Sequence, residues 1–446
     1  MKVVVVGAGM AGLAAVHTLK QAGAEVVCFE SGGNVGGRVI TERRDGFVFD
    51  PGAQFFFNQY ATCFRLADEL GMSGDRTAWL FRGAFPQKDG TFLPVVASIN
   101  PKEVFPNLGE TLRFLAGAGI PFKALKDFAG ILPMFIKRYH EFGLVDYESA
   151  LDLDRESLAD FVVRMGGKAI LEHLFQSVSA ALTLADPERL SATYGMGLLK
   201  CMINGLNTFK HGLGTITERL AGKYADSITC NSPVQRIVIE SGKVKGVEVN
   251  GAYVQADVVI PALTATKLLE IAPGLPEIYV QALHKVTYSE CCHVVFALPF
   301  KLFPKDWYAL LTPRFTKAMV SGLSDNAVKS EYYAPSGCSQ ISCWTYERFA
   351  HELNEMGDDE IKLALIKEVK RFLPAMPDEP LFTNIYRWRE AVCIGQPGML
   401  SAFTEIKRNH YRDVSGLYLA GEYLNMPSVE SAAYSGVFAA QAALRN

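Results

Sequence analysis

The chain opens on a regular alternation of apolar runs and small residues. Val3 to Val6 form a continuous apolar run, which predicts a parallel strand buried between two layers of helices. Small and apolar residues from Ala11 to Ala22 predict a helix that ends at Gly23. A second apolar run at residues 25–29 predicts another strand. This order predicts an α/β fold that begins with a Rossmann-like domain.

Glycines stand where the first strand meets the first helix. Gly7, Gly9 and Gly12 form the pattern G-x-G-x-x-G, which allows a tight turn, the approach of a pyrophosphate and close packing of the helix. The helix N-terminus would offer N–H groups to phosphate oxygens. Glu30 ends the second strand, where a carboxylate binds a ribose hydroxyl and disfavours NADP. The expected pyrophosphate contacts are Gly7, Gly9, Met10, Ala11 and Gly12. Alone, these residues suit NAD as well as FAD.

A second glycine cluster follows and extends the site. Residues 31–38 read SGGNVGGR, so that backbone amides and the Arg38 guanidinium could close over the same pyrophosphate. Asp50 and Gly52 follow as D-x-G, and residues 416–440 read GLYLAGEYLNMPSVESAAYSGVFAA. Together these segments resemble the flavin-containing amine oxidase superfamily, which includes protoporphyrinogen oxidases, carotenoid desaturases and polyamine oxidases. A plain NAD-dependent dehydrogenase would leave the second cluster and the C-terminal segment unexplained.

The resemblance implies that FAD is bound without a covalent bond and that both ends of the chain contact it. It implies that Glu422 lies near the ribityl or phosphate part, and that the backbone around Val429 lies near the pyrimidine end of the flavin ring. It places Ala53 and Gln54 beside the ring and the Val234 backbone beside adenine. The remaining expected contacts are Ser31, Gly36, Gly37, Arg38, Gly421 and Ser428.

The middle of the chain alternates between helical and strand patterns. Residues 61–205 carry apolar residues three and four apart, which predicts a helical substrate or lid region. Strand patterns follow over residues 228–260 and 286–344. The resemblance implies an interleaved α+β substrate domain. The expected parts are a discontinuous FAD-binding domain of residues 1–60, 206–275 and 390–446, the helical region 61–205, and a sheet with helices at residues 276–389.

Trp388 and His211 are the candidates for residues that act on the substrate. Trp388 stands beside Arg387 and Arg389 in a predicted strand, where it suits a substrate-facing cluster or the core. His211 could carry a proton beside the flavin or be structural. Residues 288–298 read YSECCHVVFAL and lack the lysine that amine oxidases of the superfamily carry near the flavin N5 atom. The sequence identifies no general base, and no cysteine stands where monoamine oxidases attach their flavin.

These features favour the dehydrogenation of a large, mostly apolar substrate, which is protoporphyrinogen-like or an isoprenoid or carotenoid. The expected chemistry is hydride transfer to flavin N5, with reoxidation by oxygen or a quinone. Two alternatives stay open. One is an amine oxidase, and the other is a non-catalytic FAD-binding scaffold that binds a lipid or a protein partner.

Composition narrows the partners and the location. The 446 residues carry a net charge of −3 with a pI near 6.3, so charge gives no case for nucleic acid. Nine cysteines without a C-x-x-C pair suit a reducing compartment and no metal site. Because a strand begins the chain and no apolar run is long enough to span a membrane, we expect a cytoplasmic protein. Residues 112–142 could form a lid, an anchor on a membrane surface or core helices. The oligomeric state is not predicted.

Overall fold

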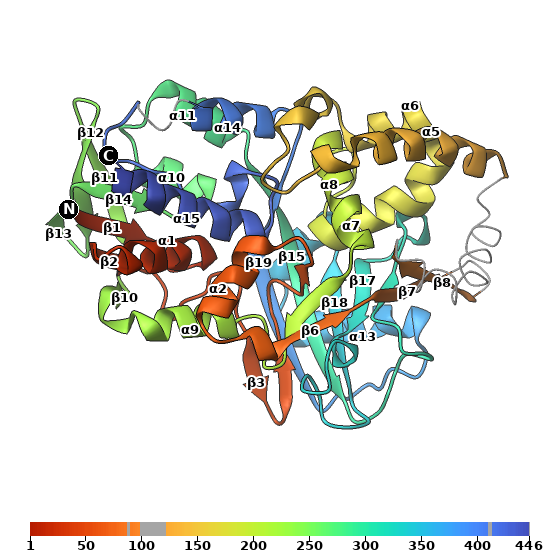
Figure 1. The fold of residues 1–446 in the computed structure, drawn as a ribbon. Coiled ribbons are helices and arrows are strands. Elements are labelled where there is room, and N and C mark those ends of the chain that lie inside the picture. The colour runs from red at the N-terminus through yellow and green to blue at the C-terminus, as the bar shows by residue number, and fades with distance from the viewer. Residues whose placement is uncertain (87–89, 99–121, 409–412, 446) are drawn as a thin grey trace.

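The computed structural model describes residues 1–86, 90–98, 122–408 and 413–445 (Figure 1). A parallel sheet in the order β10-β2-β1-β14 contains the first two predicted strands. Val3, Val4 and Val5 of its β1 strand are completely buried, as the apolar run predicts. The four strands are β1 (Lys2–Val6), β2 (Glu25–Phe29), β10 (Ile228–Thr229) and β14 (Val258–Pro261).

The first and last helices of the chain, α1 (Met10–Gln21) and α15 (Val429–Arg445), pack against each other beside this sheet (Figure 1). The segment before α15 adds an extended edge to this sheet. Leu417 makes a single parallel bridge to Val259, and the N–H group of Ala420 donates to the Pro261 carbonyl at 3.0 Å. The two ends of the chain therefore meet at the same sheet.

A separate antiparallel meander follows β10, as the alternating pattern predicts. It consists of β11 (Val234–Glu240), β12 (Lys243–Val249) and β13 (Ala252–Gln255). Asn250 and Gly251 form its second turn with φ values of 50° and 76°, because both central residues of such a hairpin turn need positive φ.

A larger, mostly antiparallel sheet has the order β19-β15-β18-β17-β16-β7-β8. Cys292, Val294 and Phe296 on one face of β15 belong to one core with Ile361 and Leu365 of α13. Cys291 and Cys292 are residues of β15. The strands are β7 (Phe81–Pro86), β8 (Phe92–Ala97), β15 (Thr287–Leu298), β16 (Ala309–Leu311), β17 (Val320–Asp325), β18 (Ser339–Thr345) and β19 (Phe382–Ile394), and the helices beside them are α12 (Glu347–Glu355) and α13 (Asp358–Phe372).

The expectation of a helical region at residues 61–205 was wrong for three segments, which form β6 (Arg76–Trp79), β7 and β8. Strand β7 pairs with β8 in an antiparallel hairpin. Strands β6 and β7 also pair with β9 (Leu206–Phe209) and β16, which come much later in the chain, and such distant partners leave no mark on local periodicity. The helices of this region are α2 (Ala61–Glu69), α5 (Phe122–Arg138), α6 (Leu158–Ile170), α7 (Gln176–Thr183) and α8 (Ala192–Ile203).

The segment proposed as a lid or anchor lies partly outside the described residues, because residues 112–121 are not among them. Its later part is α5, which continues through Pro133. No helix within the described ranges is both long and apolar enough to span a bilayer. Cytoplasmic location and membrane contact stay predictions.

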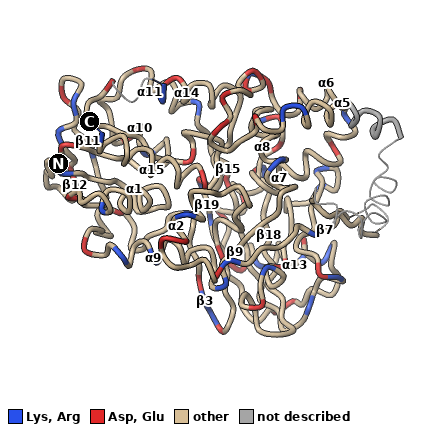
Figure 2. Tube along the Cα trace, in the orientation of Figure 1, with Lys and Arg blue, Asp and Glu red and all other residues tan. Residues whose placement is uncertain are grey.

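Charged residues of both signs are distributed along the chain, and short elements complete the architecture. Figure 2 shows the positions of Lys and Arg interspersed with those of Asp and Glu along the trace, which agrees with the small net charge. The remaining strands are β3 (Glu42–Arg44), β4 (Phe47–Phe49), β5 (Phe56–Phe57) and β9 (Leu206–Phe209), and the remaining α-helices are α9 (Thr215–Lys223), α10 (Ala265–Ile271), α11 (Glu277–His284) and α14 (Met399–Arg408).

Candidate cofactor site

The two glycine clusters lie side by side at the end of β1. Gly9 forms a parallel bridge to Gly36, and the Gly36 N–H group donates to the Ala8 carbonyl at 2.8 Å. Gly37 lies next to Gly9, since a Cβ atom on Gly37 would stand 3.4 Å from the Gly9 Cα. The structure thus brings together two segments that are separate in the sequence.

The start of α1 is closely packed and has no side-chain cap. A Cβ atom on Gly12 would stand 1.9 Å from the Gly7 carbonyl oxygen, and one on Gly436 of α15 would stand 2.0 Å from the Ala11 carbonyl oxygen. The N-cap residue Gly9 supplies no side-chain hydrogen bond, and no acidic residue lies in the first turn. N–H groups at this helix start are therefore available to an anion. A glycine cradle beside an uncapped helix start fits a pyrophosphate.

Glu30 is fixed at the end of β2. Its Oε2 atom accepts from the Ala8 N–H at 2.8 Å, and its Oε1 atom accepts from the Gly32 N–H at 2.8 Å and the Ser31 hydroxyl at 3.2 Å. Carboxylate oxygens have further lone pairs, so these bonds leave room for a ribose hydroxyl. The Glu30 carbonyl accepts from the Ser232 N–H at 2.8 Å. Ser232 therefore lies beside Glu30, and the buried Val234, which begins β11, follows two residues later.

Arg38 and Glu422 join the two ends of the chain. The Arg38 Nη2 and Glu422 Oε1 atoms are 2.6 Å apart, and the side chains are 28% and 13% exposed. Burial opposes the charge of Arg38, but the neighbouring Glu422 carboxylate outweighs burial and raises the pKa of the guanidinium. The Arg38 guanidinium also lies 5.6 Å from the centre of the Tyr288 ring. This ion pair fixes a permanent positive charge beside the glycine clusters.

The segment that contains Ala53 and Gln54 is attached to Arg38. The Ala53 N–H donates to the Arg38 carbonyl at 2.9 Å, and a Cβ atom on Gly52 would stand 2.2 Å from that carbonyl oxygen. The Gln54 amide nitrogen donates to the Gly52 carbonyl at 3.1 Å. Residues 50–54, which we call the D-x-G segment, therefore have a defined conformation.

The beginning of α15 is held by hydroxyl groups. The Ser428 hydroxyl accepts from the Ser431 N–H at 3.1 Å as a helix cap, and the Gly421 N–H donates to the Ser435 hydroxyl at 2.9 Å. The helix start at Val429 and the Gly421-Glu422 turn are thereby fixed relative to each other. The flavin contacts assigned to Ser428 and Val429 stay predictions.

The two catalytic candidates have different surroundings. The Trp388 Nε1–H donates to the Pro51 carbonyl of the D-x-G segment at 3.1 Å, so Trp388 contacts the segment that contains Ala53 and Gln54. A substrate-facing role for Trp388 stays a prediction. Arg387 and Arg389 do not join it, because alternate residues of a strand point to opposite faces. Arg387 pairs with Asp358, whereas Arg389 pairs with Glu290 and Glu355.

His211 is exposed, which argues against a proton carrier buried beside the flavin. Its ring lies 5.5 Å from the ring of Tyr332, a residue that is itself 43% exposed. Its carbonyl accepts from Arg43 at 2.8 Å and from the Thr215 hydroxyl at 3.1 Å. The structural interpretation of His211 agrees with these contacts.

Sequence analysis missed two buried bases behind the D-x-G segment. The His293 Nδ1 atom is 2.9 Å from the Pro51 carbonyl and must donate to it, so a neutral ring leaves Nε2 unprotonated. Nε2 has no hydrogen-bond partner among the described residues. Burial lowers the pKa of His293 to about 3 and that of Lys329 to about 7, the latter against the opposing pull of Asp50. Burial alone distinguishes His293 and Lys329 from other residues of their types, and no local sequence motif indicates that burial.

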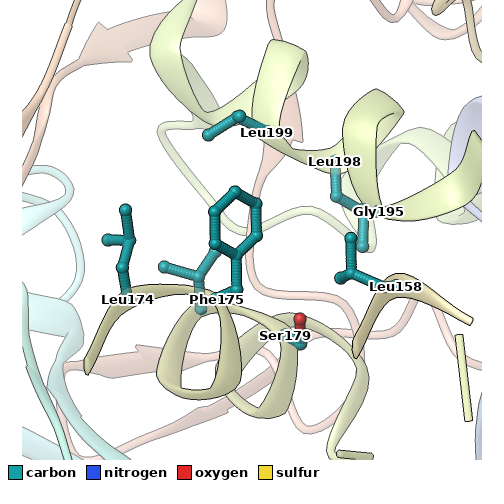
Figure 3. Close-up of a pocket in the computed structure, with 8 residues that line it drawn as sticks. Leu158, Leu174, Phe175, Ser179, Gly195, Leu198 and Leu199 are labelled. Carbon is teal, nitrogen blue, oxygen red and sulfur yellow. The ribbon is translucent and has the colours of Figure 1, made fainter. Parts of the chain in front are cut away.

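The helical part of the chain contains a small apolar cavity (Figure 3). It encloses about 20 Å³, which is about the space of one water molecule. A large substrate does not fit there without movement of the helices. The lining residues are Leu158, Leu174, Phe175, Val178, Ser179, Gly195, Leu198 and Leu199. Among the described side chains, no group of three or more His, Cys, Asp or Glu could hold a metal ion.

Comparison with known proteins agrees with this geometry. Residues 10–444 match the family model of the flavin containing amine oxidoreductases. The chain is similar to 15-cis-phytoene desaturase of Glycine max, with 27% identity that covers 100% of this chain and 80% of that protein. It is also similar to protoporphyrinogen oxidase 2 of Arabidopsis thaliana, with 21% identity over 98% of this chain and 93% of that protein.

An engineered putrescine oxidase has a similar fold. Its TM-score is 0.77 at 18% identity, and the match covers 100% of this chain and 99% of that chain. The predicted α/β fold with a Rossmann-like domain is thereby confirmed. The chain belongs to the flavin containing amine oxidoreductase family and is an FAD-dependent oxidoreductase.

Proposed function

We propose that the protein binds FAD without a covalent bond and dehydrogenates a large, mostly apolar substrate of the isoprenoid or carotenoid class. The cofactor part of this proposal is supported by the glycine cradle, the uncapped helix start and the Arg38–Glu422 pair at 2.6 Å. When bound, FAD supplies the acceptor for a hydride at its N5 atom. The chain's own residues then have to bind the substrate, orient it and exclude water from the site.

An aromatic cluster beside the D-x-G segment carries the substrate part of the proposal. The Trp79 and Tyr308 rings have centroids 4.5 Å apart, and the Phe55 ring lies 6.1 Å from Trp79 and 6.3 Å from Tyr308. Phe55 directly follows Gln54, so these rings continue the surface expected beside the flavin. Aromatic faces bind apolar, conjugated molecules through large contact areas. The cluster therefore supports an apolar, conjugated substrate.

The relatives favour the same class. The similarity to a phytoene desaturase is higher than that to a protoporphyrinogen oxidase, at 27% against 21% identity. The absence of a lysine from β15 agrees with a substrate other than a simple amine. We therefore rank a carotene precursor before protoporphyrinogen and both before an amine such as putrescine.

The test is anaerobic reduction of the purified holoprotein. Detergent-dispersed phytoene, protoporphyrinogen and putrescine are mixed separately with it, and loss of the visible absorption of oxidised flavin is followed. We expect phytoene to bleach the flavin and to yield a product with an additional double bond. Bleaching by putrescine alone would replace the proposal with an amine oxidase, and bleaching by none would favour a non-catalytic scaffold.

Two variants connect the reaction to the aromatic cluster. Phe55→Leu removes one ring of the cluster and is expected to slow flavin reduction at least several-fold, because apolar contact with the substrate is lost. Phe300→Leu, at a site that is 38% exposed, is the matched control and should react like the wild type. Equal effects of both variants on the rate of flavin reduction would show that the cluster does not contribute to the reaction. Reoxidation of the reduced protein with oxygen or with a quinone then identifies the acceptor.

A further inference from the structure

A fully buried lysine contacts the D-x-G segment from the larger sheet. Lys329 follows β17 and is 1% exposed. Its Nζ atom donates to the Gln54 Oε1 atom at 3.1 Å. It also lies 5.6 Å and 5.4 Å from the ring centres of Tyr308 and Tyr333. A long cationic side chain therefore reaches, from another part of the chain, the residue expected beside the flavin ring.

The carboxylate whose charge acts on this lysine is Asp50, in the same segment as Gln54. Asp50 is 1% exposed, and its carboxylate accepts from the Thr41 hydroxyl at 2.5 Å, the Leu213 N–H at 3.0 Å and the Tyr333 hydroxyl at 2.7 Å. Three donors thus satisfy Asp50 without Lys329. No carboxylate of the described residues forms an ion pair with the Lys329 ammonium. Asp50 acts on the Lys329 ammonium only at longer range.

The other titratable groups around Lys329 do not neutralise it. His293 on β15 faces the same segment and stays neutral, because burial lowers its pKa to about 3. Tyr308 and Tyr333 have pKa values raised by burial, so both are neutral phenols at physiological pH. An ammonium offers three donors, and the described residues give it one acceptor. A buried cation with so few partners costs stability, which a purely structural position would avoid with methionine.

We propose that Lys329 is a positioning residue whose ammonium holds the Gln54 amide and places a titratable positive charge behind the face of the D-x-G segment that meets the flavin ring. The inference rests on the proposed binding of FAD beside residues 53 and 54. A positive charge fixed there favours negative charge on the bound ring. The charge is lost as the pH rises through the neutral range, so the electron affinity of the site depends on pH.

Sulfite is the probe that tests this charge without turnover. Its sulfur lone pair forms a bond to the oxidised flavin, which takes up the negative charge, so a nearby cation tightens the adduct. We compare the sulfite Kd of the FAD-loaded wild type, Lys329→Met, Lys329→Arg and the control Lys367→Met across pH. Lys367 is an exposed residue of α13.

At slightly acid pH we expect the Kd of Lys329→Met to be about tenfold weaker than that of the wild type, which is a modest interaction for charges several ångströms apart in a protein interior. Above neutral pH the ratio should approach one, because the wild type loses its charge. Lys329→Arg should match the wild type in acid and bind more tightly above neutral pH, since a guanidinium stays charged. The use of ratios removes the titration of sulfite itself.

A ratio of one between Lys329→Met and the wild type at every pH would overturn the inference, as would an equal effect of Lys367→Met. If Lys329→Met does not retain FAD, the sulfite Kd of the wild type is compared with that of Lys329→Arg. A ratio of these Kd values that does not change with pH would overturn the inference. Failure of the wild type itself to bind FAD would instead refute the proposed function. The two failures are thus distinguishable.

Discussion

The two partners of the Arg38–Glu422 pair are expected to contribute unequally to FAD binding. Arg38→Met leaves the Glu422 carboxylate, 13% exposed, as an unpaired charge beside the place where the anionic pyrophosphate is expected. Glu422→Gln leaves the Arg38 cation, which still attracts that anion, and keeps an amide oxygen as acceptor. We therefore expect removal of Arg38 to weaken FAD binding much more than removal of Glu422.

The magnitude follows from the charges that face the pyrophosphate. Loss of a charge-assisted hydrogen bond costs about 1.5–3 kcal/mol, and repulsion of the pyrophosphate by the unpaired Glu422 carboxylate moves the expectation to the upper end. A loss of about 3 kcal/mol in FAD-binding free energy weakens the Kd of Arg38→Met about 100-fold. Glu422→Gln keeps the hydrogen bond to Arg38 and loses only the negative charge of the acceptor, about 1 kcal/mol or about fivefold. The double variant removes the unpaired carboxylate and should bind FAD more tightly than Arg38→Met.

The assay is titration of each apoprotein with FAD, followed by the quenching of flavin fluorescence. The pair of Arg389, which is 48% exposed, with Glu290 is the control, and Arg389→Met should leave the Kd unchanged. A larger loss for Glu422→Gln than for Arg38→Met would refute the reasoning. So would additive losses in the double variant, because neighbouring charges that share a ligand must couple.

Three further outcomes test the packing and the charges of the site. Gly12→Ala, whose Cβ would stand 1.9 Å from the Gly7 carbonyl oxygen, should lower the free energy of unfolding by about 1–3 kcal/mol and weaken FAD binding; thermal melting and FAD titration check both. Trp388→Phe loses its bond to the Pro51 carbonyl and should lower the unfolding free energy by about 1 kcal/mol, measured by urea denaturation; no change would argue that the bond is not formed. Between pH 7 and pH 10.5 the unfolded state binds more protons than the folded state at Lys329, because burial lowers the folded pKa from 10.5 to about 7. The unfolding free energy of the wild type should therefore rise across this window relative to Lys329→Met, by up to about 5 kcal/mol, and a parallel pH dependence of the two proteins would contradict this.

The site could be predicted from the sequence where its chemistry is local. A glycine that must lie against a carbonyl oxygen, as Gly12 does, is marked by its spacing from Gly7, and an acid such as Glu30 is marked by the strand that it ends. The parallel strand β1, the helix α1 and the hairpin turn at Asn250 all follow from patterns within a few residues. The ion pair of Arg38 with Glu422 spans 384 residues, but each partner lies in its own recognisable motif.

The rest could not be predicted because its cause is distant in the sequence. Strands β6 and β7 pair with β9 and β16, which come much later in the chain, and no local period reports those partners. His293 lies among apolar strand residues, and Lys329 follows β17 without a motif. Their altered pKa values arise from burial against the D-x-G segment, which exists only after the larger sheet has packed on the nucleotide-binding part.

That packing makes the D-x-G segment the link between the larger sheet and the expected cofactor. The Pro51 carbonyl accepts from His293 of β15 and from Trp388 of β19, while Gln54 accepts from Lys329. On its other side, the Ala53 N–H group donates to the Arg38 carbonyl. A displacement of the larger sheet must therefore move residues 51–54 relative to Arg38. Changes in the sheet should be read out in the absorption and electron affinity of the flavin even where they do not touch it.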